Sequence, residues 1–157
     1  MKKFVKFLAL VLCALSLLTF AAACSGGAEN ENESGEENGK MYLTVNENKL
    51  EVTLAENTSV YALVEILKQG DITFTVNENG NFEMYGDIGH SLPTNNTYIS
   101  ATAGDVILYS GRYLCLFFGN NSYSYTRIGK IDGYSASELR ALLGADEGSV
   151  QVTLSLD

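Results

Sequence analysis

Two tyrosines and an arginine alternate in the last quarter of the chain and form its best candidate binding surface. Tyr123, Tyr125 and Arg127 are spaced two residues apart, so in an extended strand they point to the same side. Aromatic rings beside a guanidinium can stack on a ligand, make cation–π contacts and direct hydrogen bonds. The alternative is structural: the tyrosines fill the wall of the fold and Arg127 pairs with a carboxylate.

A second candidate element is the irregular segment 86–96, GDIGHSLPTNN, which contains the only histidine and the only proline of the chain. Long irregular loops often carry function, so we expect His90 to lie beside the tyrosines, with Tyr85 completing a concave patch. His90 and Ser91, with Asp87 nearby, form the one conceivable nucleophile–base group. Neighbours in sequence rarely face each other, and no G-x-S-x-G elbow is present, so we expect no catalytic residue.

The sequence lacks the residues that a metal site or a cofactor site needs. One histidine and one cysteine far from it in the domain cannot form a ligand cluster, and no phosphate-binding glycine loop or dinucleotide fingerprint is present. We therefore expect no metal and no cofactor. Cys115 lies in the apolar run YLCLFF with no Lys or His close in sequence, so we expect a buried small hydrophobic residue and not a redox thiol.

The segment 1–23 has the pattern of a targeting peptide. Lysines charge its start, and residues 7–20 are almost purely apolar but too short for a comfortable membrane span. The AAAC that follows resembles the lipobox of bacterial lipoproteins, with Ala21 where leucine is more common. The resemblance implies cleavage before Cys24, whose lipid then anchors the chain to the extracytoplasmic face of the bacterial cell membrane. The alternative is an ordinary secretory signal followed by a chance cysteine.

The segment 24–40 is expected to be a disordered acidic tether that begins with the lipidated cysteine. After Cys24 it consists mainly of Gly, Ser, Asn and five Glu residues, with almost nothing to bury. The remaining residues, 41–157, have the length of one domain and contain six Lys and Arg residues against fourteen Asp and Glu residues. Such an acidic domain is a poor partner for nucleic acid.

Hydrophobic periodicity predicts a mainly β domain with two short helices. The first helix is expected between Asn57 and Gly70, and the second opens with the capping box 135–138. The run 113–118 is apolar without a break, so both faces of that strand should be covered. The predicted strands are 41–45, 50–54, 71–76, 82–85, 97–100, 106–109, 113–118, 122–128 and 149–156.

Two pairing arrangements are expected among these strands. The strands 106–109, 113–118 and 122–128 follow one another across short turn signals and predict an antiparallel meander. The last strand, 149–156, is expected to pair with the first and close a barrel.

Four segments of the domain resemble the small bacterial cyclophilin-like domains. They are GHSLP at 89–93, AGDVILY at 103–109, LFFGNNSYSYTRIGKI at 116–131 and SASEL at 135–139. The resemblance implies a closed antiparallel β-barrel with two short flanking helices. The peptidyl-prolyl isomerases of this fold carry a Phe-His-Arg segment and a Gly-Gly-Asp loop. This chain has neither, so no isomerase residue can be carried over.

We therefore expect a membrane-anchored extracytoplasmic module that binds a peptide or small molecule without catalysis. The alternative is a divergent peptidyl-prolyl isomerase in which Arg127 replaces the missing family arginine. A third possibility is a structural accessory subunit of an envelope complex. The expected site residues are Tyr85, His90, Tyr123, Tyr125 and Arg127.

Overall fold

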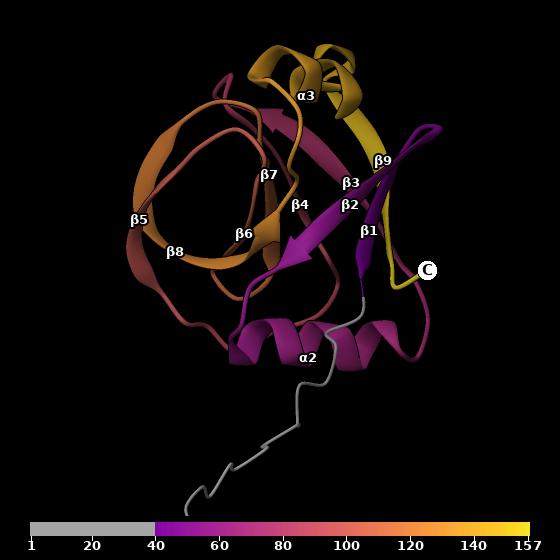
Figure 1. Ribbon diagram of the computed structural model, residues 1–157, viewed down its shortest axis with the longest axis vertical. Helices are drawn as coiled ribbons and strands as arrows, with labels where there is room; N and C mark the ends of the chain where they lie inside the picture. The colour runs from indigo at the N-terminus through magenta and orange to yellow at the C-terminus, as the bar shows by residue number, and fades with distance from the viewer. Residues whose placement is uncertain (1–39) are drawn as a thin grey trace, which may run out of the picture. The chain divides into compact units, whose positions relative to one another are not determined.

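The computed structural model describes residues 40–157 (Figure 1). The expected signal peptide, Cys24 and nearly all of the tether fall in residues 1–39, outside the described residues. Within residues 40–157, no helix is both long enough and apolar enough to cross a bilayer.

The described residues form nine strands, two α-helices and one short 3-10 helix. The prediction of a mainly β domain with two short helices is confirmed, although several strands run further than the sequence pattern indicated, above all the third and the eighth. The elements are β1 (Met41–Val45), β2 (Asn48–Leu54), α2 (Thr58–Leu67), β3 (Ile72–Asn79), β4 (Glu83–Asp87), β5 (Thr97–Ala101), β6 (Asp105–Tyr109), β7 (Tyr113–Phe117), β8 (Asn121–Lys130), α3 (Ala136–Leu142), η1 (Ala145–Glu147) and β9 (Ser149–Ser155).

The strands form one antiparallel sheet in the order β2-β1-β9-β3-β4-β7-β6-β8-β5 (Figure 1). β9 pairs with β1 from Tyr42↔Ser155 to Val45↔Val152, so the expected pairing of the last strand with the first is confirmed. β2 also pairs with β8 through Thr53↔Lys130 and Leu54↔Gly129. The pairings from β2 to β8 therefore join into a ring, and β5 extends beyond it.

The expected meander of the three central strands is wrong in its last pairing. β6 pairs with β7, but β7 gives its other edge to β4, so β8 pairs with β6 instead. β8 is long enough to be shared: residues 121–125 pair with β5 and residues 126–130 pair with β6. The turn signal after β7 was compatible with a hairpin, but turn chemistry does not determine which strand edges are already occupied.

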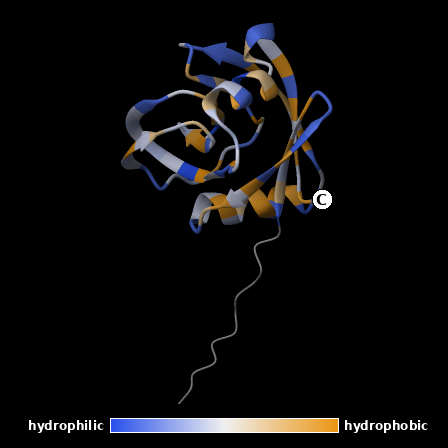
Figure 2. Ribbon diagram, turned by 45° about the horizontal axis from the view of Figure 1, so that its top comes forward, coloured by the Kyte–Doolittle hydropathy of each residue, from blue (hydrophilic) through white to orange (hydrophobic). Residues whose placement is uncertain are grey.

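Helix α2 packs its apolar side into the main core. The helix lies below the strands in Figure 1, and its hydrophobic residues are orange in Figure 2. Its N-cap is Asn57, whose Oδ1 accepts hydrogen bonds from the backbone N–H groups of Ser59 and Val60, each at 3.0 Å. The Asn57 Nδ2 donates to the carbonyl oxygen of Arg127 at 2.7 Å, which ties the start of the helix to β8. The predicted apolar positions Val60, Leu63, Val64 and Leu67 are all buried.

Successive residues of β6 and β7 enter two different hydrophobic clusters. Val106, Leu108, Leu114 and Leu116 belong to the main core. Ile107, Cys115 and Phe117 form a second cluster with Ala101 and Tyr125. Because neighbouring side chains in a strand point to opposite faces, the second cluster lies on the other face of β6 and β7. The prediction that both faces of the run 113–118 are covered is therefore confirmed.

Replacing Gly129 by Ala tests the close approach of the paired strands β2 and β8. A Cβ atom at this position would lie 2.5 Å from the backbone oxygen of Thr53, which belongs to the paired strand. We expect Gly129→Ala to lower the free energy of unfolding by about 1–3 kcal/mol, because the strands must move apart to admit the methyl group. Ser124→Ala, an exposed change on the same strand, should alter it by less than about 0.5 kcal/mol. Urea unfolding followed by circular dichroism measures both, and equal stabilities would contradict the close approach.

Candidate functional site

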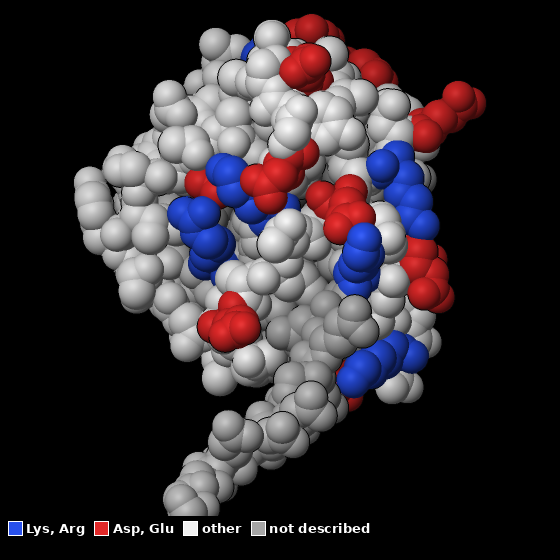
Figure 3. All heavy atoms as spheres, in the orientation of Figure 1, with Lys and Arg blue, Asp and Glu red and all other residues white. Residues whose placement is uncertain are grey.

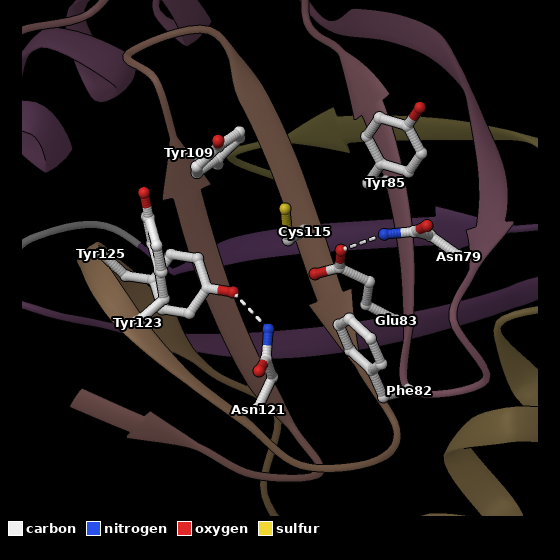
Figure 4. A pocket seen from close by; sticks show the side chains of 9 residues that line it. All are labelled: Asn79, Phe82, Glu83, Tyr85, Tyr109, Cys115, Asn121, Tyr123 and Tyr125. Carbon is white, nitrogen blue, oxygen red and sulfur yellow. Dashed lines mark hydrogen bonds between the residues drawn. The ribbon is translucent and has the colours of Figure 1, made fainter. Parts of the chain in front are cut away.

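A pocket of about 360 Å³ lies against the second hydrophobic cluster (Figure 4). Its volume falls within the range of about 300–1,000 Å³ that is typical of small-molecule sites. Cys115 and Tyr125 belong both to the cluster and to the pocket wall. The lining residues are Asn79, Phe82, Glu83, Tyr85, Tyr109, Cys115, Asn121, Tyr123 and Tyr125.

Strand alternation places the pocket residues of β4 and β7 on one face. Met84 enters the main core, so its neighbours Glu83 and Tyr85 point to the opposite face and line the pocket. The β4–β7 register pairs Tyr85 with Cys115, which brings the thiol to the same side. The pocket is therefore built on paired strands and not on a mobile loop.

Three tyrosines form a connected aromatic group on one side of the pocket. The ring centroid of Tyr125 lies 5.5 Å from that of Tyr123 and 6.2 Å from that of Tyr109, and the Tyr109–Tyr123 distance is 6.0 Å. These separations are typical of tilted and edge-to-face aromatic pairs. Tyr125 is buried, and its hydroxyl accepts a hydrogen bond from Asn121 Nδ2 at 2.9 Å. Tyr109 and Tyr123 are 40% and 53% exposed, so they form the rim.

Glu83 is the one carboxylic acid among the lining residues of the pocket. The residue is only 6% exposed, and its Oε1 accepts a hydrogen bond from Asn79 Nδ2 at 2.8 Å. Its Oε2 is buried and has no hydrogen-bond partner among the described residues. In Figure 4 this oxygen points toward the tyrosine side of the pocket. A buried polar atom without a partner is rare in folded proteins and needs an explanation.

Burial raises the pKa of the Glu83 carboxyl, because it disfavours the charged form, and the contacts with Asn79 and Cys115 offset only part of this effect. The Cys115 thiol lies near the carboxylate without making a hydrogen bond of ordinary geometry to Oε2. Burial, followed by the Glu83 charge, also raises the pKa of the Cys115 thiol. The same causes raise the pKa of the Tyr125 phenol. The thiol and the phenol therefore stay protonated at neutral pH, which suits binding better than nucleophilic chemistry.

The pocket brings together three of the five residues that the sequence suggested. Tyr85, Tyr123 and Tyr125 line it, from β4 and β8. His90 is exposed, lies in the irregular segment after β4, and is not among the lining residues. Cys115 is 3% exposed, which confirms the prediction that it is buried.

Arg127 takes part in an ion cluster around the buried Asp105, outside the pocket lining. Its Nη1 lies 2.6 Å from Oδ1 of Asp105, which is 1% exposed, and Lys130 Nζ lies 3.3 Å from the same oxygen. Asp105 Oδ2 also accepts a hydrogen bond from the backbone N–H of Thr102 at 2.8 Å. Arg127 thus makes the carboxylate pair that the structural alternative described, and it joins β8 to the start of β6.

The charges on the face shown in Figure 3 are interspersed by sign. Acidic and basic side chains lie side by side there, and the basic ones do not merge into one continuous surface. This face lacks the basic stripe that is typical of nucleic-acid-binding proteins. Among residues 40–157, no group of three or more His, Cys, Asp and Glu side chains is placed to hold a metal ion.

Glu83 is the main functional candidate that sequence reasoning missed. An alternation signal was present, because Glu83 and Tyr85 are two residues apart in a predicted strand and flank the apolar Met84. Asn79 and Asn121, by contrast, lie outside the predicted strands and gave no such signal. Asn79 ends β3 and Asn121 begins β8, and only the strand pairing brings them to the pocket.

Comparisons with known proteins agree with this architecture. The model of the cyclophilin-like family matches residues 43–155. The solution structure of the hypothetical protein AF2241 from Archaeoglobus fulgidus is similar, with a TM-score of 0.56 and 20% identity, over 76% of this chain and 95% of that protein. McbB, solved in complex with tryptophan, is similar with a TM-score of 0.52 and 16% identity, over 73% of this chain and 44% of McbB. No curated protein matches the chain. At these identities the structural likenesses establish the fold alone.

Replacing Glu83 by Gln tests whether the buried carboxyl lowers stability. Because its pKa is raised above the ordinary value of 4.5, the folded state holds the Glu83 proton more tightly than the unfolded chain does. The free energy of unfolding therefore falls as the pH rises from the ordinary pKa of the carboxyl through its raised pKa in the fold. No such loss occurs at lower pH. We expect the Gln variant to unfold a few degrees above the wild type at about pH 7 and at nearly the same temperature at about pH 4.

Glu138→Gln is the control in the same thermal unfolding series, because its effect on stability at neutral pH should be opposite to that of Glu83→Gln. The Ser135 hydroxyl and then the Ser135 backbone N–H lower the pKa of the Glu138 carboxyl. The ionised Glu138 carboxylate stabilises the fold at pH values above its ordinary pKa, and this stabilisation is lost as the pH falls through the lowered pKa. Removing this charge should slightly lower stability at neutral pH. A Glu83→Gln effect that does not change with pH would contradict the raised pKa.

Proposed function

The chain belongs to the cyclophilin-like family, and from this premise we propose that it is a lipid-anchored binding module on the extracytoplasmic face of a bacterial membrane. In this proposal a closed β-barrel domain holds a small molecule or a peptide side chain without catalysing a reaction. The observation that carries the proposal is the tyrosine-walled pocket with the buried, unpartnered Oε2 of Glu83. The pairing of β2 with β8 supports the closed barrel.

The composition of the pocket favours binding over catalysis. Small-molecule sites combine apolar and aromatic walls with a few placed polar groups, and this pocket has that character. Nucleophilic catalysis needs an activated Ser or Cys beside a base. The one thiol in the wall has a raised pKa, and no histidine is among the lining residues.

The isomerase alternative finds less support. It required Arg127 to hold the twisted peptide bond of a substrate, in place of the missing family arginine. Arg127 is instead bound to Asp105, and it is not among the lining residues of the pocket. An isomerase would therefore have to release this ion pair or use a different surface.

The anchoring part of the proposal depends on Cys24 and is tested by metabolic labelling with tritiated palmitate. We expect the full chain, expressed in a bacterium, to incorporate the label, because the anchor consists of acyl chains on Cys24. Cys24→Ser should incorporate none. Cys13→Ser, a matched change within the expected leader, should be labelled like the wild type. Label that persists in Cys24→Ser would contradict the lipid anchor.

The binding part is tested by ligand-observed NMR on the full chain in a non-ionic detergent. The library contains cationic, anionic and neutral fragments of similar size. We expect several fragments to bind, and Tyr123→Ala to raise their dissociation constants about tenfold, because it removes one aromatic wall of the pocket. Tyr98→Ala is the matched control, since Tyr98 is 77% exposed and is not a lining residue.

Two outcomes would contradict this part of the proposal. Fragments that bind the wild type and Tyr123→Ala equally well would place binding elsewhere, and a folded sample that binds none would remove the site. Acceleration of prolyl isomerisation by the wild type, lost in Tyr123→Ala, would favour the enzyme instead.

A further inference from the structure

The two amide groups of the pocket each donate one hydrogen bond within the wall, and one acceptor of the pocket has no partner among the described residues. Asn79 Nδ2 donates to Oε1 of Glu83, and Asn121 Nδ2 donates to the Tyr125 hydroxyl. Asn121 Oδ1 already accepts from the backbone N–H of Ser122 at 2.9 Å. The buried Oε2 of Glu83 remains without a partner. A ligand that completes this site must therefore donate a hydrogen bond at that oxygen.

The charge of the pocket selects among possible donors. No Lys, Arg or His residue is among the lining residues, so nothing in the wall neutralises an ionised Glu83. A neutral donor would satisfy the geometry of Oε2 but would leave the buried charge uncompensated. A cationic N–H donor does both, because charge-assisted hydrogen bonds are stronger and a buried charge needs a counter-charge. An anion would be repelled.

The aromatic wall favours the same kind of ligand. Figure 4 shows Glu83 between Tyr85 on one side and Tyr123 and Tyr125 on the other. Ring faces attract organic cations, and the attraction grows when water is excluded. The hydrocarbon part of such a ligand can pack on the rings, and the pocket volume of about 360 Å³ leaves room for an aromatic or branched aliphatic body.

We infer that the pocket binds a small organic amine in its protonated form, with the Glu83 carboxylate as counter-ion and the tyrosine rings around its body. The inference rests on the proposed binding function and adds the chemical class of the ligand. The ammonium group must carry at least one N–H, since Oε2 is a hydrogen-bond acceptor. Binding gives Oε2 of Glu83 the partner that residues 40–157 do not supply.

The test compares three probes of nearly equal shape by isothermal titration calorimetry. They are 2-phenylethylamine, the neutral 2-phenylethanol and the anionic 3-phenylpropionate, and the full chain is kept in a non-ionic detergent and an amine-free phosphate buffer. We expect the amine to bind at least about tenfold more tightly than the alcohol, and the carboxylate to bind least. Glu83→Gln should abolish the preference for the amine and leave the affinity for the alcohol within about threefold. Tyr98→Ala should change none of the three affinities.

The outcomes separate this inference from the function on which it rests. Equal affinities for amine and alcohol, or a preference for the amine that persists in Glu83→Gln, would overturn the choice of a cation and leave the pocket as a binding site. Failure of the amine to bind would also overturn it. If the wider fragment screen were negative as well, the proposed binding function would fail with it.

Discussion

The fold depends on one constraint: β6 and β7 are apolar on both faces, so both faces must be covered. One face enters the main core that α2 also covers. The other face carries Ile107, Cys115 and Phe117, which a single-layered sheet would leave in water. The remaining members of this second cluster come from β5 and β8, so the chain folds these two strands back over its own sheet. Burying this second apolar face is favourable, and it is what places the tyrosines of β8 opposite β4.

The same arrangement buries an acid that the fold does not need. Glu83 stands at the border of the second cluster, where an apolar residue would pack without cost, and one of its oxygens has no partner. Elsewhere the local signals agree with the structure: Asn57 caps α2, and Ser135 and Glu138 form the capping box of α3. Within residues 40–157, Oε2 of Glu83 is the one buried side-chain polar atom without a partner, and such a costly group in an otherwise consistent fold is characteristic of a functional site.

Sequence periodicity predicted which residues share a face, but not which strands share an edge. The strands, the helix after Asn57 and the double burial of 113–118 followed from local patterns, and the structure confirms them. The β7–β4 pairing could not be predicted in this way, because hydrogen-bond partners depend on edges that distant segments have already occupied. The same limit applied to the site: alternation grouped Tyr123 with Tyr125, yet the Glu83 that lies opposite comes from another strand.

Two buried carboxylates, Asp105 and Glu83, differ in the partners that the chain gives them. Asp105 is 1% exposed, and the chain itself satisfies it, through Arg127 at 2.6 Å, Lys130 at 3.3 Å and the Thr102 backbone N–H at 2.8 Å. Glu83 is 6% exposed and receives one hydrogen bond, from a neutral amide. Both acids lie on strands beside the second cluster, so burial alone does not distinguish them. The difference is the cation, which β8 supplies to Asp105 and which, in our proposal, a ligand supplies to Glu83.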